Sequence, residues 1–404
     1  MSEIMEDLAT YPMARGRCPF DPPPELNRLQ AEAPLNRVKL WDGSTPWLVT
    51  RYDDSRQLLA DPRISSDPRR DGFPYASAAQ AQRPGQFNAF IVRDDPEHAA
   101  QRRLVTADFM IKRVEAMRPR LQEITDGLID DLLAGPKPAD LVEALALPLP
   151  SLVICELLGV PYADRALFHR LGKTLLKRDN TPQQAQAASD ELRDYLRTLV
   201  ERKNGDPSDD LLSRLIVEQL RTGQMDVEDI VSMALLLLIA GHETTANMIA
   251  LGTVALLENP DQLAELRDTD DPKLVANAVE ELLRYLTIVH NGRRRVALED
   301  IEIGGEVIRA GEGVVIATEV ANRDEAAFPD PDILDIHRAA RHHVAFGYGV
   351  HQCLGQPLAR VELQVVYSTL YRRIPSLALA VPVDELPFKH DMAIYGVHAL
   401  PVTW

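Results

Sequence analysis

Short apolar runs in the first third of the chain alternate with clusters of proline and glycine. Two of these clusters lie at residues 22–24 and 42–43. On either side of the second cluster, β-branched and aromatic residues favour strands at 38–41 and 47–50. We therefore expect a small β-rich region here, mainly within residues 35–60.

From about residue 96 onward, apolar residues recur with the spacing of helices. The expected helices cover 97–113, 119–134, 139–158, 183–203 and 208–221. The longest apolar segment, 226–257, is interrupted at its middle by the polar residues 242–245, which favours a helix buried in the fold over a membrane span. The pattern predicts a mainly α chain with a small β region. Its helical part is expected at 97–290 and 354–373, and its second β-rich part within 293–318.

One segment near the C-terminus places a single cysteine, Cys353, in a glycine-rich loop directly before a helix. Pro357 falls in the first turn of that helix, where its missing N–H costs nothing. Free N–H groups and the positive end of the helix dipole stabilise an anion at such a position, which favours a thiolate that can bind a metal. An ordinary buried cysteine is the simpler alternative. It would need neither the flanking glycines nor His351 two residues before it.

The segment Phe346-Gly347-Tyr348-Gly349-Val350-His351-Gln352-Cys353-Leu354-Gly355 resembles the haem-binding loop of the cytochromes P450, in which a cysteine thiolate is the proximal ligand of the iron. The resemblance covers nearly the whole chain. It implies one cytochrome P450 domain over residues 1–404, with the triangular-prism fold of that family and the haem between the long central helix and the C-terminal helix. It also implies haem b as cofactor, Cys353 as the metal ligand, and Phe346 and Gly355 beside the porphyrin.

In the central helix, the run Ala240-Gly241-His242-Glu243-Thr244-Thr245 places a carboxylate and hydroxyls inside apolar sequence. Burying such groups without partners costs about 1–3 kcal/mol each. A helix kink filled by water would accommodate them. The resemblance instead makes this run the oxygen-binding groove next to the haem. Thr244 then hydrogen-bonds dioxygen, Glu243 relays protons, and a local kink accompanies both.

Four basic residues match positions that hold the haem carboxylates in the family. They are His98, Arg102, Arg295 and His351. The resemblance implies charge-assisted hydrogen bonds from each of them to the propionates. Taken singly, each could equally be a solvated surface charge.

Glu281 and Arg284 stand three residues apart on a predicted helix, a spacing usually found in surface ion pairs. The resemblance makes them members of a structural triad whose third residue is Arg338. On that reading the triad fixes the loop that holds the haem.

The substrate pocket is implied by the layout of the family alone, and most of its residues would serve equally well in a core. It is expected to be lined by Phe87, Ile91, Val92, Met233, Leu236, Leu237, Ala240, Ile288, Val289, His290, Asn291, Ile394 and Tyr395. An apolar pocket with few polar groups favours a lipophilic substrate of moderate size. The resemblance suggests macrolides, terpenoids, statins, sterol-like molecules and xenobiotics as classes.

The implied activity is that of a haem-thiolate monooxygenase that activates O2 and hydroxylates its substrate with two electrons. A peroxide-driven peroxygenase is one alternative, which the acid–alcohol pair Glu243 and Thr244 disfavours. A haem-based binding or sensor protein without turnover is another, and the proton-relay residues argue against it. Without the resemblance, Cys353 could also be the nucleophile of a hydrolase.

The composition of the chain restricts the classes of partner that it is expected to bind. A net charge of −17 over 404 residues disfavours nucleic acid. The three cysteines make no disulfide framework, and residues 1–24 are polar and proline-rich, so a cytoplasmic protein without a membrane anchor is expected. The chain contains no flavin or iron–sulfur module, so both electrons would come from a ferredoxin with its reductase. The expected docking patch contains Arg102, Arg103, Lys112, Arg113, Arg341, His342, Arg360, Arg372 and Arg373.

Overall fold

The computed structural model of the chain describes residues 8–82, 89–164, 166–167, 170–171, 182–390 and 392–404. The chain divides into two units, each built from segments far apart in the sequence. The sheet unit comprises Met1–Arg102, Glu258–Gln356 and Pro387–Gly396, and the helical unit comprises Arg103–Leu257, Pro357–Leu386 and Val397–Trp404.

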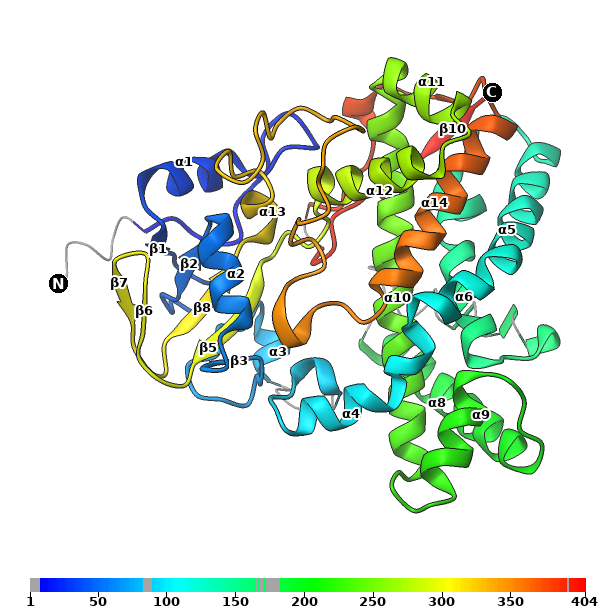
Figure 1. Cartoon of the computed structure of the whole chain (residues 1–404), viewed down its shortest axis with the longest axis horizontal. Coiled ribbons are helices and arrows are strands. Elements are labelled where there is room, and N and C mark those ends of the chain that lie inside the picture. The colour runs from blue at the N-terminus through cyan, green and yellow to red at the C-terminus, as the bar shows by residue number, and fades with distance from the viewer. Residues whose placement is uncertain (1–7, 83–88, 165, 168–169, 172–181, 391) are drawn as a thin grey trace. The chain divides into compact units, whose positions relative to one another are not determined.

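The sheet unit contains a five-stranded sheet in the order β1-β2-β8-β5-β3 (Figure 1). Its strands are β1 (Leu35–Arg37), β2 (Trp47–Val49), β3 (Ile64–Ser65), β5 (Arg293–Ala297) and β8 (Gly313–Ile316). Strands β2 and β8 run parallel, and the other neighbours are antiparallel. The sheet therefore joins the early β-rich segment to the one predicted within 293–318, which also contains the hairpin β6 (Ile301–Ile303) and β7 (Glu306–Ile308).

The strand expected at 38–41 is wrong. Instead, Leu35–Arg37 pairs with β2. Arg37 lies opposite Trp47, so the chain must reverse its direction in the short connection between these two residues. The reversal is made at Gly43, whose φ of 82° suits glycine. Beyond Arg37 the chain still bonds across the turn, from the N–H of Leu40 to the carbonyl of Ser44, but it forms no regular strand.

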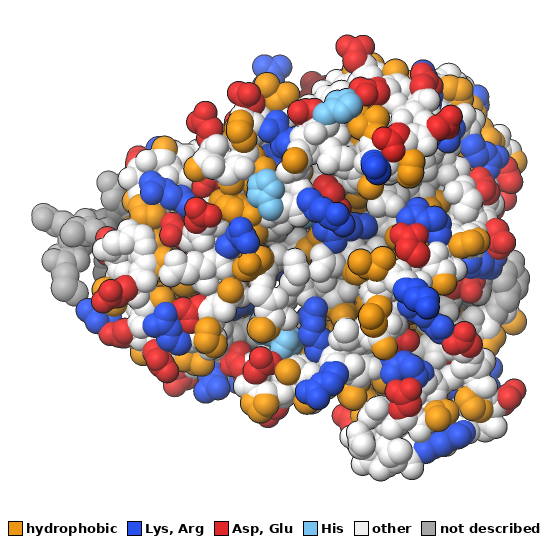
Figure 2. Space-filling view, viewed as in Figure 1, with side chains coloured by type: hydrophobic (Ala, Val, Ile, Leu, Met, Phe, Trp, Pro, Cys, Tyr) orange, Lys and Arg blue, Asp and Glu red, His pale blue; other side chains and the backbone are white. Residues whose placement is uncertain are grey.

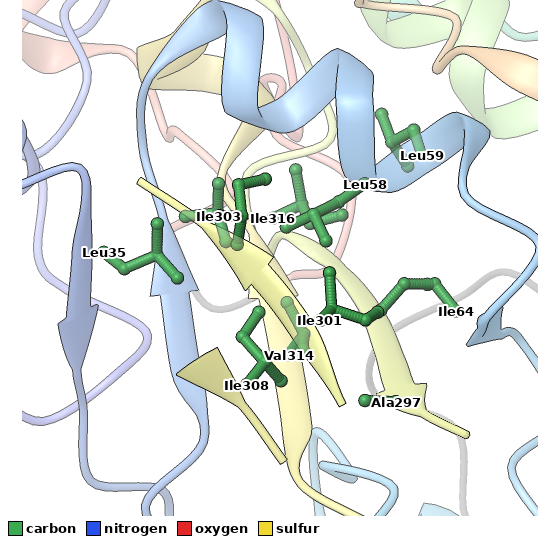
Figure 3. Packing of buried hydrophobic residues seen from close by; sticks show 11 residues of the cluster. Leu35, Leu58, Leu59, Ile64, Ala297, Ile301, Ile303, Ile308, Val314 and Ile316 are labelled. Atoms are coloured by element: carbon green, nitrogen blue, oxygen red, sulfur yellow. The ribbon is translucent and has the colours of Figure 1, made fainter. Parts of the chain in front are cut away.

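A hydrophobic cluster joins the helix α2 (Tyr52–Ala60) to the strands. Figure 3 shows Leu58 beside Ile316, and Leu59, Val314 and Ile301 belong to the same cluster. All five side chains are buried, so their apolar surface stabilises this part of the unit. The other helices of the sheet unit are α1 (Pro24–Glu32), α3 (Ala78–Ala81), α4 (Glu97–Thr106), α11 (Pro260–Asp268), α12 (Pro272–Leu286) and α13 (Thr318–Ala321). Helix α4 ends just inside the helical unit.

The helical unit is built around α10 (Val227–Leu257), which packs against α6 (Pro148–Leu158) and α8 (Pro182–Gly205). It also contains the helices α5 (Ile111–Ala134), α9 (Leu211–Leu215) and α14 (Gln356–Arg373), and a sheet in the order β4 (Ala139–Asp140), β10 (Pro401–Thr403), β9 (Ala378–Leu379). Among the described residues α10 alone is long and apolar enough to cross a membrane, and 72% of its apolar window is buried in the protein. It is the core helix that the pattern predicts.

Two predicted helix boundaries are wrong. The break between α4 and α5 lies at residues 107–110 and not after 113, and Pro119 lies inside α5. At the break, the buried carboxylate of Asp108 is bound by Arg214, a partner more than a hundred residues away that a local pattern cannot include. The helices expected at 139–158 and 208–221 also begin or end in π-helical turns, at Val142–Ala146 and Ile216–Leu220.

Candidate functional site

Cys353 lies between a 3₁₀ turn (Gly349–His351) and the start of α14. Its N–H donates to the carbonyl of Phe346 over 2.9 Å, which closes the loop. Gly349 has φ of 72°, and a Cβ there would lie 2.4 Å from the carbonyl oxygen of Leu59, so the loop requires glycine at this position. The Cys353 side chain is exposed, whereas Cys155 is buried in α6.

Two imidazoles lie together in the sheet unit. The ring centroids of His98, on α4, and His351 are 4.2 Å apart. His351 Nε2 contacts Ser66 Oγ at 3.1 Å, and His98 Nδ1 contacts a carboxylate oxygen of Asp95 at 2.9 Å. His98 Nε2 is buried and has no hydrogen-bond partner among the described residues. On the same helix, Arg102 Nη2 donates to the carbonyl of Gln352 over 2.7 Å, next to the cysteine.

Arg295, on β5, adds a positive charge that forms no ion pair with a carboxylate of the described residues. Its guanidinium donates to the carbonyl of Arg294 over 2.7 Å, and it forms no ion pair within the described parts of the chain. Burial, with the neighbouring charge of Arg293, lowers the pKa of Arg295 to about 10. Burial, with the charge of Arg295, also lowers the pKa of His351 to about 3. Both shifts have the direction expected of cationic groups that are desolvated beside like charges.

Haem b fits this site on chemical grounds. Its two propionates are carboxylates, and the site offers a buried imidazole nitrogen, His98 Nε2, that lacks a partner. His98, Arg102, Arg295 and His351 are thus the residues that would hold the propionates, and Cys353 would bind the iron. All five residues belong to the sheet unit.

Arg293 was missed by the sequence reasoning. It precedes Arg295 by two residues on β5, so both side chains stand on the same face of the strand. Arg293 Nη2 donates to the carbonyl of Ala345 over 2.8 Å, at the start of the cysteine loop. Its Nε is buried without a partner among the described residues. The alternation along the strand was the signal that could have found it.

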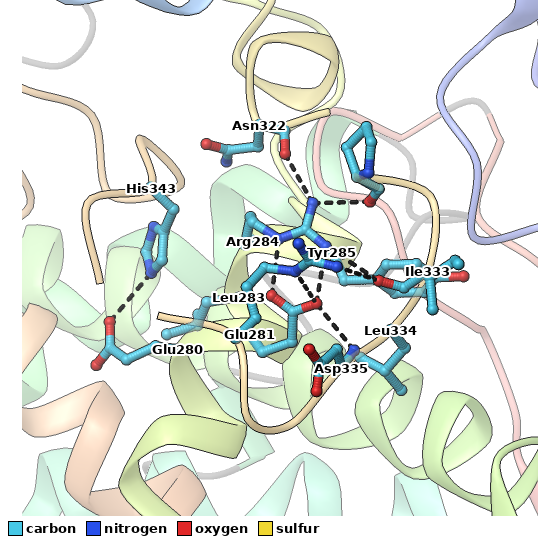
Figure 4. Close-up of polar contacts among 12 residues, drawn as sticks. Glu280, Glu281, Leu283, Arg284, Tyr285, Asn322, Ile333, Leu334, Asp335 and His343 are labelled. Atoms are coloured by element: carbon cyan, nitrogen blue, oxygen red, sulfur yellow. Dashed lines mark hydrogen bonds and ion pairs between the residues drawn. The ribbon is translucent and has the colours of Figure 1, made fainter. Parts of the chain in front are cut away.

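The predicted triad is brought together on α12 and the loop after α13 (Figure 4). The side chains of Glu281 and Arg284 are both 0% exposed and share two hydrogen bonds, of 2.7 and 2.8 Å. Arg338 Nε lies 3.1 Å from Glu281 Oε1. Arg284 Nη1 also donates over 2.9 Å to the carbonyls of Asn322 and Pro331. The pair therefore fixes the loop from residue 322 to 338.

In the helical unit, α10 continues without interruption through the run 240–245, so the expected kink does not break the helix. Thr244 Oγ1 donates to the carbonyl of Ala240 over 2.8 Å, a bond that satisfies the hydroxyl within the helix. Asn247 Nδ2 donates to the backbone carbonyl of Glu243 over 2.8 Å and to its side-chain Oε1 over 3.0 Å. A Cβ on Gly241 would lie 3.1 Å from Ile154, so the backbone is tightly approached there.

The residues expected to line the substrate pocket fall into separate groups. Phe87 lies outside the described residues, and Ile91 and Val92 form part of a 3₁₀ turn in which Ile91 is 44% exposed. In the helical unit, four of the expected residues lie on α10: Met233, Leu236, Leu237 and Ala240. In the sheet unit, Ile288, Val289, His290, Asn291, Ile394 and Tyr395 lie on two adjacent segments.

These two adjacent segments meet through an antiparallel bridge between Val289 and Ile394. The ring centroids of His290 and Tyr395 are 5.2 Å apart, and the N–H of Tyr395 donates to the carbonyl of Ile288 over 2.7 Å. Burial lowers the pKa of His290 to about 4, so this imidazole is neutral at pH 7.

Comparison with known proteins agrees with this chemistry. The family profile described as cytochrome P450 matches residues 32–374. Cytochrome P450 GfsF of Streptomyces halstedii is 58% identical over 99% of this chain and 97% of its own. The crystal structure of GfsF superposes with a TM-score of 0.95, covering 98% of this chain and 100% of that one. The mycinamicin VIII C21 methyl hydroxylase MycCI of Micromonospora griseorubida, solved with mycinamicin VIII bound, is 42% identical with a TM-score of 0.89, covering 98% and 100% of the two chains. The chain is therefore a member of the cytochrome P450 family, whose cofactor is haem b.

Proposed function

We propose that this cytochrome P450 monooxygenase hydroxylates a lipophilic small molecule with two electrons delivered by a ferredoxin. When bound, haem b supplies the iron at which dioxygen is activated, and thiolate ligation favours cleavage of the O–O bond. The observation that carries the proposal is the glycine-closed loop of Cys353 in the same unit as the buried imidazole nitrogen His98 Nε2, which has no partner among the described residues.

Proton delivery is assigned to α10. Thr244 holds a proton at Oγ1, which it now donates to the carbonyl of Ala240 and could present to the oxygen being reduced. Glu243 is the acid that would replace this proton. Its side chain is oriented by the amide of Asn247, which donates to Oε1 over 3.0 Å. This assignment favours O2 over peroxide as the oxidant.

A lipophilic substrate is supported by the side chains of the expected pocket. Those on α10 are apolar, and the imidazole of His290 is neutral. The name of MycCI describes hydroxylation of a methyl group of mycinamicin VIII, a reaction of the proposed type. The proposed classes are macrolides, terpenoids, statins, sterol-like molecules and xenobiotics.

Ferredoxin docking is assigned to exposed cations. Figure 2 shows Lys and Arg side chains interspersed with Asp and Glu over the face it presents, so single residues matter more than net charge. Arg113 forms an ion pair with Asp209, at 2.5 Å, and Arg373 forms one with Asp126, at 3.1 Å. These two arginines are weaker candidates for docking than their sequence positions suggest. Lys112 is exposed and has no ion pair with a described carboxylate.

The proposal is tested by turnover with a surrogate ferredoxin and reductase. Ligands are first found by titrating the ferric protein with a library of lipophilic compounds and following the spectrum. Each ligand is then supplied with NADPH and O2. Consumption of NADPH that depends on the ligand and yields a hydroxylated product is expected. Product formed only with added peroxide would favour a peroxygenase, and ligand binding without turnover would favour a sensor.

Cys353→Ser tests the ligand assignment directly. The variant should lose the red-shifted Soret band of the ferrous carbonyl complex, because a serine hydroxyl does not replace thiolate donation. Cys155→Ser, in the buried α6, is the matched control and should keep the band. A Cys353→Ser variant with the normal band would show that another residue binds the iron.

A further inference from the structure

Arg293, the first of three consecutive arginines on β5, lies next to the cysteine loop. Along β5 the side chains of Arg293 and Arg295 share one face, and Arg294 stands on the other. Arg294 Nη1 donates to the carbonyl of Pro74 over 2.8 Å, so it is engaged away from the loop. The guanidinium carbon Cζ of Arg293 lies 3.3 Å from where a Cβ on Gly347 would be. The guanidinium thus occupies the space beside a glycine of the cysteine loop.

The contacts of Arg293 are directed at that loop. Nη2 donates to the carbonyl of Ala345 over 2.8 Å. Cys353 lies close enough for a thiolate to favour the charged form of Arg293, although burial lowers the pKa of the guanidinium. Nε is buried and has no partner among the described residues, so one donor of the guanidinium fork remains for a ligand.

The positive charge of Arg293 is poorly neutralised by the protein. No carboxylate of the described residues lies within ion-pair distance, and the acid that acts on it from further away is Glu319. Burial raises the pKa of Glu319 to about 7, and its Oε1 accepts a long hydrogen bond of 3.5 Å from the hydroxyl of Tyr11. At neutral pH Glu319 therefore offers Arg293 only a fraction of a negative charge.

We propose that Arg293 is a positioning residue for the haem thiolate: it holds the cysteine loop through the carbonyl of Ala345 and raises the reduction potential of the bound haem. The inference rests on haem binding by Cys353. Reduction adds one electron to the haem, so an uncompensated positive charge near the thiolate would stabilise the ferrous form relative to the ferric form. The same charge draws electron density toward the sulfur and away from the iron, which acts in the same direction.

The test is the midpoint potential of the substrate-free holoprotein in three variants. Arg293→Gln should favour the ferric form on the order of tenfold, which is a shift of about −59 mV for a one-electron couple. Arg294→Gln removes the same charge from the opposite face of the strand and should change the equilibrium much less. Arg293→Lys keeps the charge and should stay near the wild-type potential.

A second measurement separates charge from loop geometry. Arg293→Lys lacks the planar fork that reaches the Ala345 carbonyl. It should therefore lose the red-shifted Soret band of the ferrous carbonyl complex faster in mild urea than Arg294→Lys does. If Arg293→Gln yields no holoprotein, the comparison of the two lysine variants in urea tests the proposal in its place. Equal rates of loss of the red-shifted band in Arg293→Lys and Arg294→Lys would overturn it. If Arg293→Gln shifts the potential no more than Arg294→Gln, the proposal is wrong. A wild type without the red-shifted band would instead contradict the proposed function itself.

Discussion

Two buried glutamates show how the surroundings of one residue decide its contribution. Glu281 accepts hydrogen bonds from Arg284, from Arg338 and from the N–H of Asp335, so its buried charge is compensated. Glu362, on α14, is equally buried, but its Oε2 has no partner among the described residues. Burial alone raises the pKa of Glu362 to about 8. The first carboxylate fixes a loop, and the second is a source of instability at neutral pH.

Glu281→Gln and Arg284→Leu should each give little holoprotein. Either change leaves a charge buried without its partner, at a cost of about 3–5 kcal/mol. Arg28→Leu is the matched control, because Arg28 and Glu25 have the same spacing on α1 but are exposed. Haem content per protein and urea unfolding measure the effect. Full haem content in both buried variants would show that the triad does not hold the site.

Glu362→Gln should stabilise the protein, and more so at higher pH. Between the unfolded pKa of about 4.5 and the folded pKa of about 8, the folded state keeps a proton that the unfolded state has released, so the wild type loses stability as pH rises. The loss amounts to about 1.4 kcal/mol per pH unit at most. Thermal midpoints at pH 5 and pH 8 measure it. The exposed Glu115 is the control position, and a Glu362→Gln gain independent of pH would contradict the argument.

Single residues were predictable from the sequence where a local constraint marks them. Cys353 stands out because a glycine loop and a helix start are both visible in the pattern. The spacing of Glu281 and Arg284 is visible too, but spacing does not report burial. Arg293 was not predicted for a different reason. Three adjacent arginines do not by themselves indicate which of them faces the cysteine loop, and only the strand places alternate residues on opposite faces.

At the scale of elements, α10 and α14 are in close contact within the helical unit. The hydroxyl of Tyr367, on α14, donates to the carbonyl of Met248, on α10, over 2.5 Å. A Cβ on Gly252 would lie 1.9 Å from that hydroxyl, so the close approach of the two helices requires glycine. Within α10, Thr244 donates to the carbonyl of Ala240 and Asn247 donates to the carboxylate of Glu243, so a hydroxyl and a carboxylate are hydrogen-bonded in its apolar middle.

Thr244→Ala should leave haem and substrate binding intact and divert electrons to peroxide, because the hydroxyl is assigned to proton delivery only. Thr253→Ala is a close control, since Thr253 lies on the same helix and also donates to the carbonyl four residues back, over 2.8 Å. It should lower stability without changing coupling. The readout is product and peroxide formed per NADPH. Equal coupling in the two variants would remove Thr244 from the proton path.

Elements were predictable where they are long. The apolar segment of α10 is too long for a loop, so a helix was predictable there. The polar residues at its middle correctly indicated a helix buried in the protein. The predicted boundaries of helices and strands were wrong where residues distant in the sequence determine where an element ends. The ion pair of Asp108 with Arg214 ends α4, and the register with β2 places β1 at Leu35–Arg37. Neither interaction lies within the window that a periodic pattern uses.

At the scale of the whole molecule, each unit assembles segments from both halves of the chain. Residues 387–396 belong to the sheet unit, and the following segment to residue 404 belongs to the helical unit. Periodicity cannot predict such a return of the chain, because no local signal marks it. The resemblance of the cysteine loop to a known family supplied the fold that periodicity could not.

The net charge of −17 makes the location of exposed cations decisive for an acidic electron donor. Lys112 and Arg103 are exposed and have no ion pair with a described carboxylate, so their fields are not cancelled locally. Lys112→Glu and Arg103→Glu should raise the apparent Michaelis constant for ferredoxin and leave substrate affinity unchanged. The effect should shrink as salt shortens the Debye length from about 10 Å at 0.1 M toward 3 Å at 1 M. Lys137→Glu is the charge-matched control, since it follows the far end of α5, a 24-residue helix about 36 Å long. Ferredoxin kinetics that respond equally to all three reversals would show that net charge, and not a docking surface, governs association.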